Sequence, residues 1–287
     1  PSSQGGLMTF LASLIEPEAL NLIALLGVVF IGLPHGAMDG ALAAHFGWLN
    51  RPSKAVLFLL SYIGLALLVV GSWMVAPVLI FVGFLGISLL HFGRGDSTSN
   101  DAGQERIESV ARGGLVIAGI SQAHRTEVNE VFLTLVGSST TMIWVFLDIM
   151  LVITLFSMME VLVFKQRKER LGFVVEMILL STLFILAAPL VGFAIYFCFV
   201  HSFRHFSNMK TTLSPTISKF RVTQTTLVFS LLTWGAGLLV FSQQSASIGF
   251  EPALLRVVFI GLAALTVPHM ILIDGILEHE SPRKTLA

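Results

Sequence analysis

The residues of this 287-residue chain best suited to chemistry are histidines that fall inside apolar segments. Five of its eight histidines lie in long hydrophobic runs: His35, His91, His201, His205 and His269. His201 and His205 are four residues apart, so a helix would project both rings from one face, about one turn apart. Neutral imidazole is a ligand for zinc, copper, iron and nickel. The pattern therefore predicts a metal site built from histidines on several helices.

Two carboxylates stand close to these histidines in the sequence. Asp39 follows His35 by four residues, and Asp274 follows His269 by five. A carboxylate that accepts the N–H on the far side of a ligand imidazole fixes the ring's tautomer and orientation. We therefore expect Asp39 to orient His35 and Asp274 to support His269. The single cysteine, Cys198, excludes a CxxC metal site.

The composition is that of an integral membrane protein. Hydrophobic residues make up 55% of the chain and charged residues 12%, with a mean hydropathy of +0.86. Soluble domains have about 25% charged residues. The formal net charge is zero and the basic residues are scattered, which excludes nucleic acid as a partner. We expect one domain over residues 1–287, with residues 1–6 forming a disordered, processed end.

The hydropathy pattern predicts an all-α, polytopic transmembrane bundle. A spanning helix needs about 20 mostly apolar residues. Nine segments approach this: 20–46, 54–75, 77–92, 107–123, 140–164, 171–188, 190–209, 223–243 and 253–277. The fourth is the least apolar, because it contains Glu108 and Arg112. Residues 125–137 are expected to form a short helix at the membrane interface.

The basic residues predict how this bundle is oriented. If all nine segments span, thirteen of the 17 lysines and arginines face one side, which the positive-inside rule makes cytoplasmic. The N-terminus is then outside and the C-terminus inside, in the cell's inner (plasma) membrane. The five histidines all fall late in odd-numbered segments, which run from outside to inside. The predicted metal site therefore lies in the cytoplasmic half of the membrane.

The stretch that carries His35 has further unusual residues. Gly32, Gly36 and Gly40 recur at intervals of four, which predicts a ridge of small residues against which another helix packs closely. Pro34 lacks a backbone N–H and disrupts the local helix. We expect it to re-aim the turn so that His35 points inward.

Four motifs in this order give the chain a family resemblance. They are "GLPHGAMDG" (32–40), "HFGRGD" (91–96), "HSFRHF" (201–206) and "VPHMILID" (267–274). Together they resemble the Brp/Blh family of bacterial and archaeal membrane β-carotene 15,15′-dioxygenases, whose product, retinal, supplies microbial rhodopsins. The resemblance covers nearly the whole chain.

The resemblance implies an Fe(II) enzyme that uses O₂ to split the central 15,15′ double bond of β-carotene into two all-trans-retinal molecules. It implies iron ligation by His35, His91, His201 and His205. His269 matches a further family histidine, and its role as ligand or neighbour stays open. A functional link to a microbial rhodopsin is also implied.

β-Carotene partitions into membrane lipid, so its binding site should be apolar, aromatic and open to the membrane. The chain has 23 phenylalanines and two tyrosines. Aromatic residues alternate with the paired histidines over 196–206, and we predict that Tyr196, Phe203 and Phe206 contact the polyene. Arg204 is expected to reach the cytoplasmic interface.

Two other classes compete with this interpretation. A membrane di-metal hydroxylase or desaturase needs several clustered histidine boxes, and this chain has one HxxxH, at 201–205. A histidine-rich metal or proton transporter would favour more carboxylates deep in the membrane, where only Asp148 is well inside a segment. Haem would need histidines on its two opposite faces, which a pair on one helix cannot supply.

Overall fold

The computed structural model describes residues 16–99, 101–213 and 217–277, which are helical with no strand; the predicted disordered end at residues 1–6 lies outside this part. The α-helices are α2 (Pro17–Gly27), α3 (Asp39–His45), α4 (Pro52–Val75), α5 (Pro77–Asp96), α6 (Ala102–Gly114), α7 (Ile120–Ala123), α8 (Arg125–Val136), α9 (Thr141–Phe164), α10 (Arg167–Leu186), α11 (Pro189–Ile195), α12 (Ser202–Leu213), α13 (Lys219–Ile248) and α14 (Phe250–Met270). Several are joined end to end by tighter or wider turns. These turns are 3₁₀-helical at Leu33–Met38 and π-helical at Val28–Gly32, Leu115–Gly119, Tyr196–His201 and Ile271–Leu277.

Every one of the nine predicted segments is largely helical in the described residues. Within the described part of the chain, six helices are both long and apolar enough to cross a membrane: Pro17–His45, Pro52–Val75, Pro77–Asp96, Thr141–Phe164, Lys219–Ile248 and Phe250–Ile276. Three further helical stretches, 102–123, 167–186 and 189–213, carry more charged and polar side chains. The protein is thus a helical bundle with six candidate spans by length and composition, where nine were predicted.

The outer helices expose more apolar surface than a stable protein exposes to water. The most apolar stretches of α4 and α13 are each only 6% buried within the protein, although their mean hydropathies are 2.4 and 1.6. Leu57 on α4 and Leu238 on α13 are each 66% exposed. Contiguous apolar surface of this extent marks a membrane or partner interface in a stable protein. Lipid is the environment that these helices fit.

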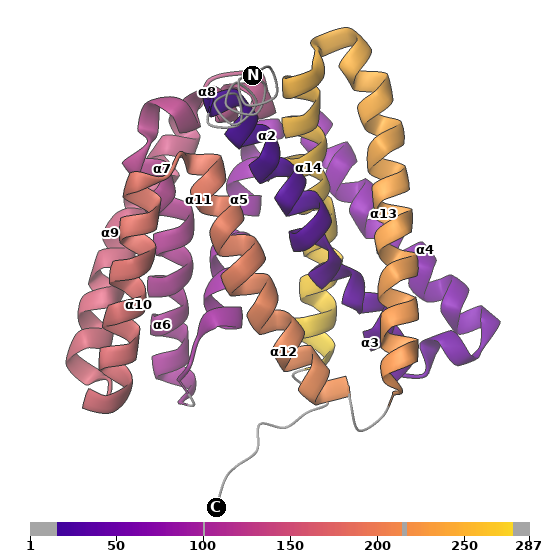
Figure 1. The fold of residues 1–287 in the computed structure, drawn as a ribbon, viewed down its shortest axis with the longest axis horizontal. Helices are drawn as coiled ribbons and strands as arrows, with labels where there is room; N and C mark the ends of the chain where they lie inside the picture. The colour runs from indigo at the N-terminus through magenta and orange to yellow at the C-terminus, as the bar shows by residue number, and fades with distance from the viewer. Residues whose placement is uncertain (1–15, 100, 214–216, 278–287) are drawn as a thin grey trace, which may run out of the picture.

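The helices are arranged around a central group of α2, α5 and α14 (Figure 1). On one side, α5 packs on α6 and α6 on α9, with α7, α10 and α11 alongside. On the other side, α14 packs against α4 and α13. The short helix α8 contacts α14 and α5, and it covers the residues predicted to form a short helix, 125–137. The stretches that carry the histidines contact one another next to this central group, because 33–38 and α5 each pack against both α12 and α14.

Glycines bring helix backbones into direct contact at two places. A Cβ at Gly93 would overlap the backbone of Ser109, and one at Gly113 would overlap the backbone of Leu89, so α5 and α6 cross at backbone contact distance. On the predicted glycine ridge, Gly32 and Gly40 lie against aromatic rings. Gly36 instead faces open space, because no atom lies within 4 Å of a Cβ built there.

Prolines mark both helix starts and the histidine-bearing turns. Pro77 and Pro189 begin α5 and α11, where the missing N–H costs nothing. Pro34 lies in the 3₁₀ turn one residue before His35, and Pro268 lies inside α14 one residue before His269. At both interior positions the missing N–H interrupts the regular α-helical ladder next to a histidine.

Candidate metal centre

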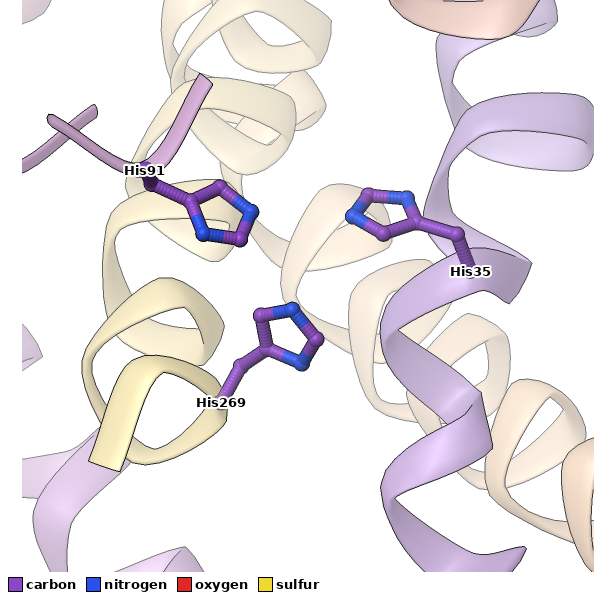
Figure 2. A group of neighbouring side chains, drawn as sticks. All are labelled: His35, His91 and His269. Atoms are coloured by element: carbon purple, nitrogen blue, oxygen red, sulfur yellow. The ribbon is translucent and has the colours of Figure 1, made fainter. Parts of the chain in front are cut away.

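Five histidine rings from four separate helical stretches meet at one buried point. The ring centroids are 5.2 Å apart for His35 and His205, 5.0 Å for His91 and His201, and 5.2 Å for His205 and His269. Ring nitrogens of His35, His91 and His269 all lie within 4.8 Å of one another. Figure 2 shows these three rings facing a common centre from different helices. These three nitrogens are close enough together to hold a metal ion.

The irregular helix around Pro34 orients His35. Its Nδ1 donates a hydrogen bond to the carbonyl oxygen of Gly32 at 2.5 Å, and the Ser202 hydroxyl oxygen lies 3.3 Å from the same nitrogen. Because a carbonyl can only accept, Nδ1 carries the proton. The neutral ring then has an unprotonated Nε2, which is the form that binds a metal.

Asp39 supports His269 and not His35, which corrects the prediction from spacing. Its Oδ1 accepts a hydrogen bond from His269 Nδ1 at 2.8 Å, and its Oδ2 accepts one from the Tyr62 hydroxyl at 2.8 Å. The prediction assumed an α-helix, in which residues four apart share a face. Residues 33–38 form a 3₁₀-helix, which has three residues per turn. Side chains four residues apart therefore point about 120° away from each other around the helix axis. Asp39 therefore points toward α14.

His201 also faces a buried carboxylate, that of Asp96 at the end of α5, but at a longer distance than a hydrogen bond. Asp96 Oδ1 lies 3.6 Å from His201 Nδ1, and Asp96 Oδ2 accepts a hydrogen bond from the Tyr196 hydroxyl at 2.7 Å. On the other side of its ring, His201 Nε2 lies 3.3 Å from His91 Nε2. His201 thus presents Nε2 to the other histidines and Nδ1 to a buried carboxylate.

The donor set fits a bound metal ion. The Nε2 atoms of His205 and His269 are buried and have no hydrogen-bond partner among the described residues. An unpartnered polar atom in a buried position is costly and calls for a ligand. All five donors are imidazoles, which suit iron, zinc, copper and nickel. Since no thiolate or carboxylate lies among them, they would leave the ion's full charge in place.

Two charged residues close to the histidines in the sequence form ion pairs. Asp274 Oδ2 lies 3.6 Å from Arg94 Nη1. Arg204, which was predicted to reach the cytoplasmic interface, pairs with Glu176 at 2.7 Å and lies 3.5 Å from Asp96 Oδ1. The buried carboxylate of Asp96 on α5 and the half-buried carboxylate of Glu176 on α10 hold this guanidinium beside the site.

The histidines form part of the wall of a large apolar cavity. His35, His91 and His269 line it together with residues from α4, α5, α7, α8, α11, α13 and α14. Most of the other lining side chains are aliphatic or aromatic, including Phe81, Phe84, Phe132, Phe193, Phe197 and Phe259. An apolar cavity with a few convergent polar groups is the usual form of a small-molecule site.

The three aromatic residues predicted to contact the polyene do not line this cavity. Tyr196 is buried against Asp96, Phe206 packs in a second core cluster near α3, and Phe203 is 68% exposed. Phe203 lies two residues from each of the paired histidines, so an α-helix turns it to the opposite face. Phe197, four residues before His201, takes the expected place in the lining.

Three residues that support the histidines or their carboxylates were not predicted from the sequence. Asp96 is the last residue of the motif "HFGRGD", five residues after His91. A carboxylate so close to a histidine in a membrane segment could have been predicted as a site residue. Tyr62 and Ser202 had no such signal, because their contacts come from other helices.

The fold and the site define a membrane-embedded helical protein with a histidine centre in the wall of an apolar cavity, an architecture suited to a metalloenzyme with a lipid-soluble substrate. Comparison with known sequences then gives the family. The profile of the family Beta-carotene 15,15'-dioxygenase matches residues 26–276. A Beta-carotene 15,15'-dioxygenase from an uncultured marine bacterium, 66A03, is 37% identical over 266 residues, which cover 91% of this chain and 95% of that protein. The chain belongs to the β-carotene 15,15′-dioxygenase family, and is an enzyme of that class. No solved structure matches it.

Proposed function

We propose that this protein holds iron(II) at the five-histidine centre and uses O₂ to cleave the central 15,15′ double bond of β-carotene, producing two all-trans-retinal molecules. The observation that carries the proposal is the position of the histidine cluster in the wall of an apolar cavity, in a chain of the β-carotene 15,15′-dioxygenase family. The retinal would supply a microbial rhodopsin.

The proposed ligands are His35, His91, His201 and His205, with His269 as a fifth nitrogen donor. Iron(II) bound there would supply the redox chemistry that O₂ needs to react with a closed-shell polyene. The residues of the chain hold the imidazoles in the unprotonated-Nε2 form and exclude water from the reacting bond. No proton or external electron is required, since the C=C bond of the polyene and the O=O bond of O₂ are replaced by two C=O bonds.

The helices that line the cavity support cleavage at the centre of the polyene. The lining residues of the cavity come from two groups of helices. One part is formed by Ile120 and Val131 on α7 and α8, and the other by Tyr62, Phe229 and Trp234 on α4 and α13. These helices stand on opposite sides of α14 (Figure 1). A symmetric substrate with its central bond at the histidines would place one half in each part.

The proposed membrane setting is the inner membrane, with nine spans, the N-terminus outside and the C-terminus inside. Support comes from the charge distribution, because the α9–α10 connection with its basic residues and the start of α13 lie at the same end of the bundle (Figure 1). The histidine centre would then lie in the cytoplasmic half, with lipid supplying the substrate.

The decisive experiment measures iron content and retinal formation on purified protein given β-carotene. We expect about one iron per chain and loss of both iron and retinal in His201→Ala and His205→Ala. His124→Gln is the matched control, because His124 lies at the α7–α8 junction and bonds the Phe184 carbonyl away from the cluster. Normal iron content and turnover in both alanine variants would refute the assignment.

A further inference from the structure

Both tyrosines of the chain occupy equivalent positions beside the histidine centre. The chain has only two, Tyr62 and Tyr196, against 23 phenylalanines. The Tyr62 hydroxyl donates to Asp39 Oδ2 at 2.8 Å, and the Tyr196 hydroxyl donates to Asp96 Oδ2 at 2.7 Å. Each tyrosine thus uses its hydroxyl to hold one oxygen of a carboxylate that belongs to a different helix.

The second oxygen of each carboxylate faces the Nδ1 atom of a histidine in the cluster. Asp39 Oδ1 accepts from His269 Nδ1 at 2.8 Å, and Asp96 Oδ1 lies 3.6 Å from His201 Nδ1. Asp39 is 1% exposed and Asp96 is 3% exposed. A carboxylate buried to this degree is stable only when its oxygens are satisfied by donors or by a positive charge.

We propose that Tyr62–Asp39–His269 and Tyr196–Asp96–His201 are two positioning relays of the metal centre. In each relay the tyrosine fixes the carboxylate, and the carboxylate keeps the proton on Nδ1. The imidazole therefore directs an unprotonated Nε2 at the metal, with raised basicity. The proposal rests on the proposed metal function. It assigns a role to both tyrosines and to Asp96, and it makes His269 a held nitrogen donor.

The two relays differ in the contact between the carboxylate and its histidine. Asp39 makes a full hydrogen bond to its histidine, whereas Asp96 Oδ1 is also 3.5 Å from Arg204 Nη1. Arg204 is in turn bonded to Glu176 at 2.7 Å, so the guanidinium draws Asp96 toward α10. We therefore expect the Asp39 relay to contribute more to metal affinity than the Asp96 relay.

The test is a titration of metal-free purified protein with Co(II), a spectroscopic probe whose visible absorption reports both occupancy and ligand geometry. Asp39→Asn and Asp96→Asn keep the side-chain volume and are expected to raise the Kd for Co(II) by about 10–100-fold, the usual cost of losing such a partner. Tyr62→Phe and Tyr196→Phe should raise the Kd by a smaller factor and shift the absorption bands, because each carboxylate is left less firmly held.

The control is Asp148→Asn, which removes an exposed carboxylate that pairs with Arg125 on α8. Its Kd and spectrum should match the wild type. Unfolding midpoints of the metal-free proteins identify any aspartate variant that fails to fold, in which case the milder phenylalanine variants decide the outcome. Kd values within twofold of wild type and unchanged spectra in the folded variants would overturn the relays. A wild-type protein that binds no Co(II) would instead overturn the metal centre itself.

Discussion

His269 and Asp39 are joined by a 2.8 Å hydrogen bond across 230 residues of sequence. The contact links the end of α14 to the start of α3, and so connects the last membrane helix of the chain to the first. Because the carboxylate is buried and also bonded to Tyr62, the link fixes the position of both helices at the centre. The histidine centre is thus a place where distant segments of the chain are held together.

Filling the cavity beside His35 should block the substrate without unfolding the protein. Gly36 lines the cavity, and a Cβ built there meets no atom within 4 Å. Gly36→Leu is expected to lower β-carotene turnover at least about tenfold, since the loss of 1.4 kcal/mol of binding is already a factor of ten. Iron content and the unfolding midpoint should stay at wild-type values.

The matched comparison is Gly93→Leu, where the new side chain would overlap the backbone of Ser109 on α6. This variant should lower the yield of folded protein as well as its turnover. Wild-type turnover in Gly36→Leu would show that the substrate does not pass this part of the cavity.

Phe197 should matter for substrate use and Phe203 should not. Phe197 lines the cavity and stacks over His201 with ring planes 10° apart, whereas Phe203 is 68% exposed on the opposite face of the helix. Phe197→Leu should raise the KM for β-carotene by about tenfold, corresponding to about 1.4 kcal/mol. Phe203→Leu should keep wild-type kinetics, and steady-state retinal formation measures both. The reverse ranking would contradict the assigned lining.

A buried ion pair should be a main support of the helices behind the site. Lys165 Nζ lies 2.5 Å from Glu108 Oε2, and Glu108 Oε1 accepts from Arg112 at 2.7 Å. Lys165→Met leaves part of this buried charge uncompensated, which costs about 3 kcal/mol or more. Unfolding titrations should show the loss, and exposed Lys168→Met should show none.

The double variant Glu108→Gln/Lys165→Met provides the internal check on this pair. Removing both charges should recover part of the lost stability, because neither partner is then left alone in a buried position. A double variant less stable than the sum of the two single losses would contradict the ion-pair explanation.

The orientation of the bundle can be measured with single cysteines. Ser138 and Gln166 are exposed residues that flank the two ends of α9. A cysteine at position 166 should react with a membrane-impermeant thiol reagent only from the cytoplasmic side, and one at 138 only from the outside. Cys198 is buried and serves as an unreactive background. Labelling of both positions from the same side would contradict α9 as a span.

The location of the helices and the identity of the central histidines followed from local sequence properties. Apolar runs of sufficient length can only be satisfied as helices in lipid, because every backbone polar group must then bond within its own segment. Histidines inside such runs are costly, and their common depth followed from the distribution of lysine and arginine. The structure brings all five together, as this reasoning predicted.

The partners of those histidines were decided only by the tertiary structure. Asp39 was assigned to His35 because an α-helix places residues four apart on one face, but the 3₁₀ turn after Pro34 directs it to His269. Asp96 reaches His201 because glycines let α5 pack closely on its neighbours. Helical periodicity predicts which face a residue occupies only while the helix stays regular. Contacts between helices depend on packing, which no local pattern in the sequence encodes.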